Sequence, residues 1–290
     1  MNKNILIYEP LYKKNQKLVD PAFVPLKIKD NSLSAWRELK HLVDIYDSGA
    51  NLKAKYTGLF SPKFELKTHI SGSEFIDFVN NKPGADVYII NPFPQIKYWS
   101  YNVWMQGDIA HPGLKSAAVR LLEAAHIPLD IEKTPRHGSG LLSYSNFWVG
   151  TSNFWEEYVG SVLKPIYKFL LDNLSHSVTI DVMAITKHTV NAPLLPFIIE
   201  RLLSTYISFN RNIDVISYSH SEAEIVDKCC INDFERLLVG LMKSEIDSAD
   251  LRSEFSDILI GRMNLACQLF QRHHLDLYEF RSHPHQLSSL

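Results

Sequence analysis

A short segment in the first half of the chain combines a carboxylate, an imidazole and aromatic surface. Trp104-Met-Gln-Gly-Asp108 is closely followed by His111. Tryptophan faces stack on sugars and bases, while amide and carboxylate oxygens fix the orientation of a bound ligand. A carboxylate whose pKa is raised by its pocket can take the proton of an attacking hydroxyl. The segment predicts Asp108 as a general base and Trp104 as acceptor-binding surface, with a surface loop carrying a core tryptophan as the alternative.

A second group of reactive side chains, Arg136 and His137, lies in a Pro/Gly loop over residues 135–140. A guanidinium can bind phosphate oxygens through two parallel hydrogen bonds, and glycine lets backbone N–H groups approach them. The loop is not a P-loop, because no Gly-Lys-Ser/Thr follows, and it lacks the glycine that a serine-hydrolase elbow needs at position 137. We predict that both residues stabilise a leaving phosphate group; the alternative is an ordinary turn.

The clearest buried strand, over residues 86–90, ends at Asn91-Pro-Phe-Pro94. Ligands of open α/β sheets bind beyond the carboxyl ends of the strands, so this position predicts that Asn91 positions a ligand. The alternative is a strand exit that needs proline only for its geometry.

Residues 141–149 alternate in the way that is typical of a strand, with Tyr144, Asn146 and Trp148 on one face. Aromatic rings beside an amide are typical of a ligand pocket, so we predict that these three residues form an aromatic binding platform. A helix is predicted to begin at Asn153, with that side chain as its N-cap.

Glu200 and Arg201 lie within a predicted helix, residues 193–208, that is apolar nearly all round. Charged groups in such a helix must be paired or face a cavity. We therefore favour a substrate-facing position for both side chains over a solvated helix face.

The sequence contains no Asp-x-Asp pair, which would hold a divalent cation against a diphosphate. The nearest substitutes at a predicted strand end are Asp130 and Glu132, in a short strand predicted over residues 129–132, and we assign them to the donor side. The metal ligands are unknown at this stage, and the choice between Mg²⁺, Mn²⁺ and no metal stays open.

Composition limits the class of protein. The chain has 290 residues, of which 46% are apolar and 21% charged, as in an ordinary globular protein. A formal net charge of −2 argues against nucleic acid as a partner. The sequence suggests no secretory or membrane-spanning segment, and three cysteines without a CxxC pair fit a reducing compartment. We expect a cytoplasmic protein and leave peripheral attachment to the inner membrane open.

Strand and helix patterns alternate up to about residue 220, and the remainder is helical almost throughout. This pattern predicts an α/β domain over residues 1–220 and a helical C-terminal extension over residues 221–290. The extension could pack on the α/β domain, bind a partner enzyme, or form a homodimer interface.

Four segments within about residues 50–205 carry a further pattern. They are Tyr56-Thr-Gly-Leu-Phe-Ser-Pro-Lys-Phe64, Asp86-Val-Tyr-Ile-Ile-Asn-Pro-Phe-Pro94, Tyr144-Ser-Asn-Phe-Trp-Val149 with Asn153-Phe-Trp155, and Phe197-Ile-Ile-Glu-Arg-Leu202. In these segments the chain resembles glycosyltransferases, and glycosyltransferase-like proteins of unassigned activity, encoded in bacterial capsule and lipopolysaccharide loci.

The resemblance implies a GT-A-like α/β domain that binds a nucleotide sugar. It implies a donor side with Lys63 and Asn91, and an acceptor side with Tyr144, Asn146, Trp148, Glu200 and Arg201. The missing Asp-x-Asp pair departs from most GT-A enzymes. Basic side chains such as Lys63, Arg136 or His137 could instead neutralise the leaving diphosphate.

The expected activity is transfer of a sugar from a nucleotide diphosphate donor to a hydroxyl of a saccharide acceptor in surface-polysaccharide synthesis. The alternative is a non-catalytic saccharide-binding or assembly subunit of a polysaccharide-synthesis complex, which the missing metal ligands favour. A pocket that combines carboxylate and basic residues would favour the enzyme, and one lined by aromatic residues alone would favour the binding subunit.

Overall fold

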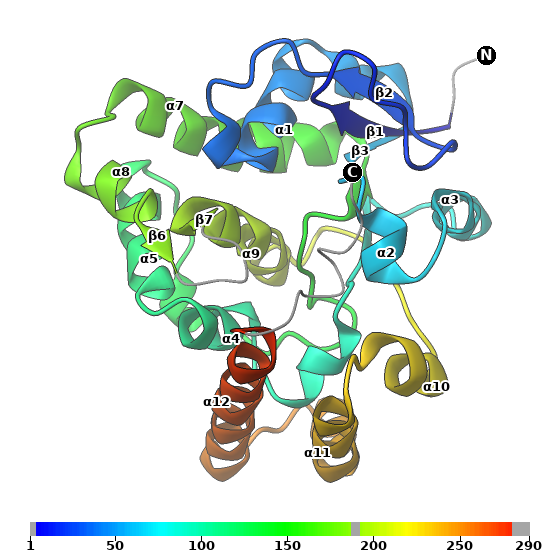
Figure 1. Cartoon of the computed structure of the whole chain (residues 1–290), viewed down its shortest axis with the longest axis vertical. Helices are drawn as coiled ribbons and strands as arrows, with labels where there is room; N and C mark the ends of the chain where they lie inside the picture. The colour runs from blue at the N-terminus through cyan, green and yellow to red at the C-terminus, as the bar shows by residue number, and fades with distance from the viewer. Residues whose placement is uncertain (1–3, 187–191, 280–290) are drawn as a thin grey trace.

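The computed structural model describes residues 4–186 and 192–279 (Figure 1). Its main sheet has six strands in the order β2-β1-β3-β5-β4-β8. They are β1 Ile5–Leu11, β2 Val24–Lys27, β3 Tyr56–Leu59, β4 Val87–Ile90, β5 Trp148–Gly150 and β8 Val215–Tyr218. Five strands run parallel, and β5 is antiparallel to both β3 and β4. The predicted α/β class is confirmed, with a mixed sheet.

Helices account for most of the remaining described chain. The α-helices are α1 Glu38–Asp47, α2 Phe64–Thr68, α3 Gly72–Asn81, α4 Val103–Ala110, α5 Leu114–Ala124, α6 Ser152–Phe154, α7 Lys164–Asp172, α8 Ser177–Val182, α9 Leu194–Phe209, α10 Glu222–Glu224, α11 Asp233–Arg252 and α12 Asp257–Glu279. Shorter or wider turns are η1 Ser34–Trp36, η2 Ala50–Lys53, η3 Pro94–Tyr98, η4 Ile131–Lys133, and the π-helical η5 Trp155–Leu163 and η6 Ile225–Cys229. A two-stranded ladder joins β6 Ile185–Thr186 to β7 Ala192–Pro193.

Helices cover both faces of the main sheet, and the alternation of side chains along β4 separates two cores. Val87 and Ile89 face a large core that includes residues of α1, α5, η5 and α9. Tyr88 and Ile90 face a smaller core with residues of α2 and α3. Burying both faces of a strand explains why residues 87–90 are uninterrupted apolar sequence.

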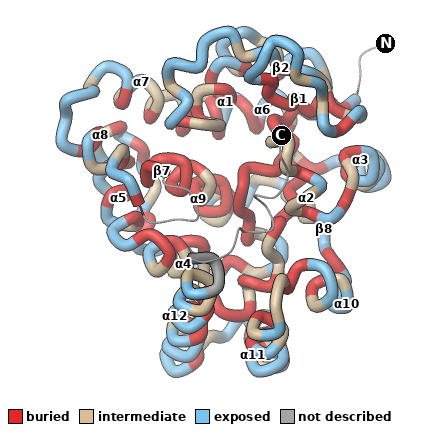
Figure 2. The backbone as a smooth tube through the Cα atoms, in the orientation of Figure 1, coloured by how far each residue is buried: buried red, intermediate tan, exposed pale blue. Residues whose placement is uncertain are grey.

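Helix α9 lies at the centre of the larger core. Nearly all of its residues are buried, including Arg201, as Figure 2 shows by the red tube. A helix that is apolar all round is expected in the middle of a protein. The predicted helix over residues 193–208 is thereby confirmed, as is the strand predicted over residues 86–90, which runs from Val87 to Ile90.

The C-terminal part is helical, as expected from its pattern, and it shares the larger core. Val239 and Met242 of α11 and Met263 and Cys267 of α12 belong to the same buried cluster as α9. The two helices lie together at one end of the molecule (Figure 1). Positions 280–290 of the predicted extension lie outside the described residues. This packing brings α12 to the wall of the candidate site.

Three local predictions are wrong. Residues 129–132 do not form a strand, because Ile131–Lys133 turns as a 3₁₀ helix capped by Asp130. The strand predicted over residues 141–149 is limited to Trp148–Gly150, since Ser145 and Asn146 adopt left-handed conformations with φ of 67° and 52°. The helix that follows is capped by Thr151, whose side chain accepts from the N–H of Phe154, rather than by Asn153.

Candidate functional site

A cavity of about 460 Å³ lies beyond the carboxyl ends of β3 and β4, where ligands of open α/β sheets bind. We call it the central cavity. It is bounded by the start of α1, by α2 and η3, by α4 and α9, and by α12. Its charged or hydrogen-bonding side chains are Arg37, Glu38, Ser61, Lys63, Lys67, Gln95, Gln106, His111, Tyr144, Ser145, Glu200, Arg201, Glu235, Gln271 and His274.

Helix α2 presents two lysines to the central cavity. Lys63 occupies the N-cap position and Lys67 follows four residues later, so that both lie on one side of the helix. Phe64 and Thr68, each one position further along, are buried and fix the neighbouring side of the helix. The ammonium group of Lys67 donates to Ser145 Oγ at 3.1 Å. Burial, together with the positive charges of Lys67 and Arg37, lowers the pKa of Lys63.

Helix α9 presents Phe197, Glu200 and Arg201 to the same cavity, because residues three and four apart share a helix face. The Arg201 guanidinium is held in place by hydrogen bonds to Val103 O at 3.0 Å, to Phe197 O at 2.7 Å, and to Gln106 Oε1 at 2.5 Å. Its charge lies over the Tyr144 ring, 5.4 Å from the centroid. The guanidinium is therefore rigidly oriented before any ligand arrives.

Three cations of this cavity lack a carboxylate partner. Arg37, Lys67 and Arg201 form no ion pair with any residue in the described ranges. Positive charges that no carboxylate offsets favour an anionic ligand, and Arg201 is in addition buried. The cavity is thus suited electrostatically to phosphate groups.

Two carboxylates, Glu38 and Glu200, lie beside these cations, and Glu200 is the one next to Arg201 on α9. Within residues 4–186 and 192–279 it makes no hydrogen bond and no ion pair, although it is only partly exposed. Burial raises its pKa, against the opposing charge of Lys67. A carboxylate with a raised pKa and unoccupied lone pairs is suited to accept a proton.

Glu235 lines the far side of the cavity, and its carboxylate is hydrogen-bonded within the protein. Its carboxylate accepts from Gln95 Nε2 at 3.1 Å and from the backbone N–H of Ile231 at 3.3 Å. Burial raises the pKa of Glu235 to about 7. Its contacts join η3 to α11, so we give it a positioning role.

The segment that carries Ser145 and Asn146 is strained, and strain of this kind concentrates at functional sites. Ser145 lines the central cavity. Asn146 is buried, and neither atom of its amide has a hydrogen-bond partner among the described residues. A buried amide without partners is expensive unless a ligand or water satisfies it, which agrees with a binding role for this segment.

Arg136 does not lie at the predicted phosphate-binding position but in a network of hydrogen bonds within the protein. Its guanidinium bonds Asp250 at 3.0 and 3.1 Å and the carbonyl oxygens of Lys97, Ser100 and Tyr101. All of these contacts connect the residues around η3 to α11. The predicted leaving-group role does not fit Arg136, because its donors are occupied.

We expect Arg136→Ala to lower the free energy of unfolding by about 2–4 kcal/mol, because it leaves a half-buried carboxylate and three carbonyl groups without their donor. Urea unfolding measures the loss. The matched control is Arg120→Ala, which removes an exposed pair with Asp181 and should cost less than about 1 kcal/mol. Equal losses in the two variants would contradict the structural role of Arg136.

His137 is completely buried and lies outside the residues that line the central cavity. Its Nδ1 accepts from the N–H of Val103 at 3.4 Å, and its backbone N–H donates to Tyr101 O at 3.0 Å. Burial, with the charge of Arg136, lowers the pKa of His137 to about 3. A neutral ring inside the core cannot stabilise a leaving diphosphate, so the role predicted for His137 does not fit its position either.

The low pKa of His137 predicts acid sensitivity. The unfolded chain binds a proton below pH of about 6.5 and the folded chain does not until about 3, so stability is lost as pH falls through this window. At pH of about 5 the expected loss is about 2 kcal/mol relative to neutral pH. His137→Asn keeps an acceptor but cannot titrate. Urea midpoints at both pH values should show a smaller decrease for this variant, and an equal decrease would contradict the assignment.

The three predicted carboxylates outside α9 are not at the central cavity. Asp108 is exposed and accepts from the backbone N–H of Lys115 at 3.1 Å, near the start of α5. Asp130 is ion-paired with Lys133 at 2.8 Å, and Glu132 is paired with Lys115. These exposed groups stabilise local structure, and their predicted base and donor-binding roles have no support in their positions.

The aromatic residues predicted to bind an acceptor do not lie together at the central cavity. Trp104 is buried, with its indole N–H donating to Thr205 Oγ1 at 2.8 Å, and Trp148 is buried against Trp155. Neither ring is available to an acceptor. Tyr144 does line the central cavity, together with the predicted Lys63, Glu200 and Arg201. Asn91 closes a turn onto Phe93 and lines a neighbouring cavity instead.

Within residues 4–186 and 192–279 no group of three or more His, Cys, Asp or Glu residues is arranged to hold a metal ion. Asp130 and Glu132 are both engaged with lysines. We therefore assign no metal ligands and derive no step through a metal.

Sequence reasoning missed Arg37 and Lys67. Arg37 has φ of 46° at the junction of η1 and α1, which no local pattern indicates. Lys67 could have been found, because it lies four residues after Lys63 in a segment that follows a strand end.

Comparison with models of known protein families, with curated proteins and with solved structures gave no match. In the part of the chain that the structure describes, every helix is too short or too polar to cross a bilayer. A functional assignment therefore depends on the geometry and chemistry of the site.

Proposed function

We propose that the protein is a glycosyltransferase with a GT-A-like nucleotide-sugar site in the central cavity. The observation that carries the proposal is the combination of three cations without ion-pair partners and two carboxylates, Glu38 and Glu200, without a partner among the described residues, all on one cavity at the carboxyl ends of parallel strands. A diphosphate donor needs the cations, and an attacking hydroxyl needs the carboxylate.

The donor diphosphate binds against Arg37, Lys63 and Lys67. These side chains supply the charge that offsets the negative charge developing on the leaving nucleoside diphosphate. They are brought together by the start of α1 and by the helix after β3, both fixed by buried neighbours. Arg201 adds a fourth positive charge from α9.

Glu200 is the general base in this proposal and replaces Asp108. The acceptor oxygen attacks the anomeric carbon of the donor, the bond from that carbon to the diphosphate oxygen breaks, and Glu200 takes the hydroxyl proton. Ser145 and Tyr144 supply acceptor contacts beside it. The products are the new glycoside and the nucleoside diphosphate.

The alternative is a non-catalytic saccharide-binding or assembly subunit, in the cytoplasm or at the inner membrane. Such a subunit has no need for an unpaired carboxylate next to three unpaired cations, so the charge distribution that the described residues give the central cavity favours the transferase.

The proposal is tested by thermal unfolding of the purified protein with UDP-, GDP-, CMP- and dTDP-sugars, each with and without Mg²⁺ or Mn²⁺. We expect selective stabilisation by one nucleotide, since a ligand at about 100 times its Kd adds about 2.7 kcal/mol. We also expect the shift without added metal. If oligosaccharides stabilise the protein and no sugar nucleotide does, the transferase proposal fails and the binding subunit takes its place.

A further inference from the structure

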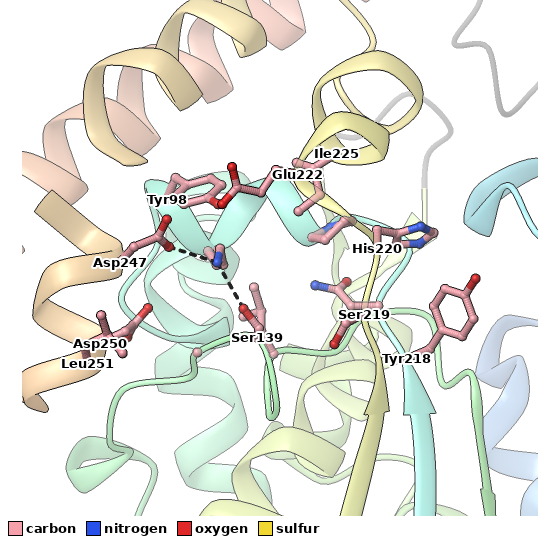
Figure 3. Close-up of a pocket in the computed structure, with 15 residues that line it drawn as sticks. Tyr98, Ser139, Tyr218, Ser219, His220, Glu222, Ile225, Asp247, Asp250 and Leu251 are labelled. Carbon is pink, nitrogen blue, oxygen red and sulfur yellow. Dashed lines mark hydrogen bonds and ion pairs between the residues drawn. The ribbon is translucent and has the colours of Figure 1, made fainter. Parts of the chain in front are cut away.

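A second cavity of about 620 Å³ lies on the other side of η3 from the central cavity. Strands β4 and β8 are parallel neighbours, so their carboxyl ends bring Asn91 close to Ser219 and His220. Helix α11 faces them with Asp247 and Asp250, and Figure 3 shows these groups arranged around the hollow. We call it the β8 cavity.

The charges of the β8 cavity are already neutralised. Lys97 pairs with Asp247 at 3.1 Å. Lys243 pairs with Glu222 at 2.8 Å and with Asp247 at 2.9 Å, and Arg136 pairs with Asp250 at 3.0 Å. Among the described residues, no lining cation is left to attract phosphate, and each lining carboxylate has its own cation. The ligand best suited to such a lining carries no net charge.

The β8 cavity nevertheless has unused hydrogen-bonding groups. His220 is only 8% exposed, and neither of its ring nitrogens has a hydrogen-bond partner within the described ranges. Burial lowers the pKa of His220, so its ring offers one donor and one acceptor at neutral pH. The hydroxyl of Ser219 is exposed beside it, and Ser139 accepts from Lys97 at 3.1 Å across the cavity.

Aromatic and aliphatic surface completes the lining. Tyr98 is buried under the Lys97 ammonium group, so the ring open to a ligand is the half-buried Tyr218, which packs on His220 with centroids 5.2 Å apart. Leu142 and Ile225 are buried apolar neighbours. Rings beside groups that both donate and accept are the usual surface for sugar hydroxyls and the apolar faces of pyranose rings.

We propose that the β8 cavity is a second saccharide-binding site that takes an uncharged oligosaccharide. Its volume lies within the range of ordinary ligand pockets. Because Pro94 and Lys97 line the β8 cavity while Gln95 and Ile96 line the central cavity, one glycan chain could contact both. This site goes beyond the proposed transferase activity, since binding here requires neither a donor nor Glu200.

The test places a reporter thiol at the rim of the cavity through Ser219→Cys. The native Cys229, Cys230 and Cys267 are buried, and burial raises the pKa of each to about 12, so they react slowly with N-ethylmaleimide. The probes are maltotriose, cellotriose and chitotriose as neutral saccharides and inorganic pyrophosphate as the anion. Ser73→Cys, exposed on α3, is the matched control.

We expect at least one neutral trisaccharide to slow alkylation of the Ser219→Cys thiol about tenfold at about ten times its Kd, and to leave the Ser73→Cys thiol unaffected. Adding His220→Phe, which keeps the ring but removes both nitrogens, should abolish the protection. Adding Lys67→Met should not, which separates this proposal from the transferase proposal. Protection by pyrophosphate in place of the saccharides, or by none of the four probes, would overturn the assignment.

Discussion

Glu200→Gln is expected to reduce the turnover of sugar transfer by about 10²- to 10⁴-fold, the usual contribution of a general base. The amide keeps the size of the side chain and its place on α9 but cannot take the acceptor proton. Binding of the donor should change little, because the diphosphate is bound by Arg37, Lys63 and Lys67. Steady-state kinetics with saturating donor should therefore show a loss in kcat and a nearly unchanged donor KM.

The pH profile separates a base from a merely structural carboxylate. Burial raises the pKa of Glu200, so wild-type turnover should fall with decreasing pH at a higher pH than an ordinary glutamate, with a pKa of about 4.3, would give. Glu200→Gln should lose this acidic limb. Glu123→Gln, on the exposed face of α5, is the matched control and should behave as wild type. A variant at Glu200 that keeps wild-type turnover would rule out the base role.

Lys67→Met should lower kcat/KM for the donor by about 10²- to 10³-fold, as does removal of one preorganised group that stabilises a developing anion. Methionine keeps most of the apolar stem but removes the charge and the hydrogen bond to Ser145 Oγ. We expect the loss to fall on both donor affinity and turnover. Calorimetric titration with the nucleotide identified in the thermal screen measures the change in donor affinity, and initial rates measure the change in turnover.

The control for this variant is Lys168→Met, which removes an exposed lysine of α7 that does not line the central cavity. It should leave donor binding and turnover unchanged. If Lys67→Met weakens binding of neutral oligosaccharides as strongly as binding of the nucleotide, then Lys67 does not act on a diphosphate.

The sequence predicts the elements whose signal is local and continuous. Residues 87–90 are buried on both faces, and α9 is apolar nearly all round. Each of these patterns depends on neighbours along the chain. The substrate-facing positions predicted for Glu200 and Arg201 followed from the same kind of signal, because charges in an apolar helix need a cavity or a partner.

The parts that could not be predicted depend on tertiary contacts. His137 and Arg136 stand in a Pro/Gly loop that is typical of an exposed turn, yet Val103 and Asp250 hold them in packed positions. The alternation over residues 141–149 is typical of a strand, but Ser145 breaks it with a left-handed conformation that non-glycine residues adopt rarely. The electrostatics of the central cavity arise from residues 37, 67 and 201, which no local pattern links.

The most direct test of the central claim is a mass-spectrometric assay of wild-type protein with a sugar nucleotide and an oligosaccharide acceptor, run beside Glu200→Gln. We predict release of the nucleoside diphosphate and an acceptor heavier by one sugar residue, with the product formed at least about 10²-fold more slowly by the variant. Product formed equally by both proteins would contradict the role of Glu200. If wild-type protein binds the nucleotide but yields no product with any acceptor, the central cavity is a binding site and the protein is not a transferase.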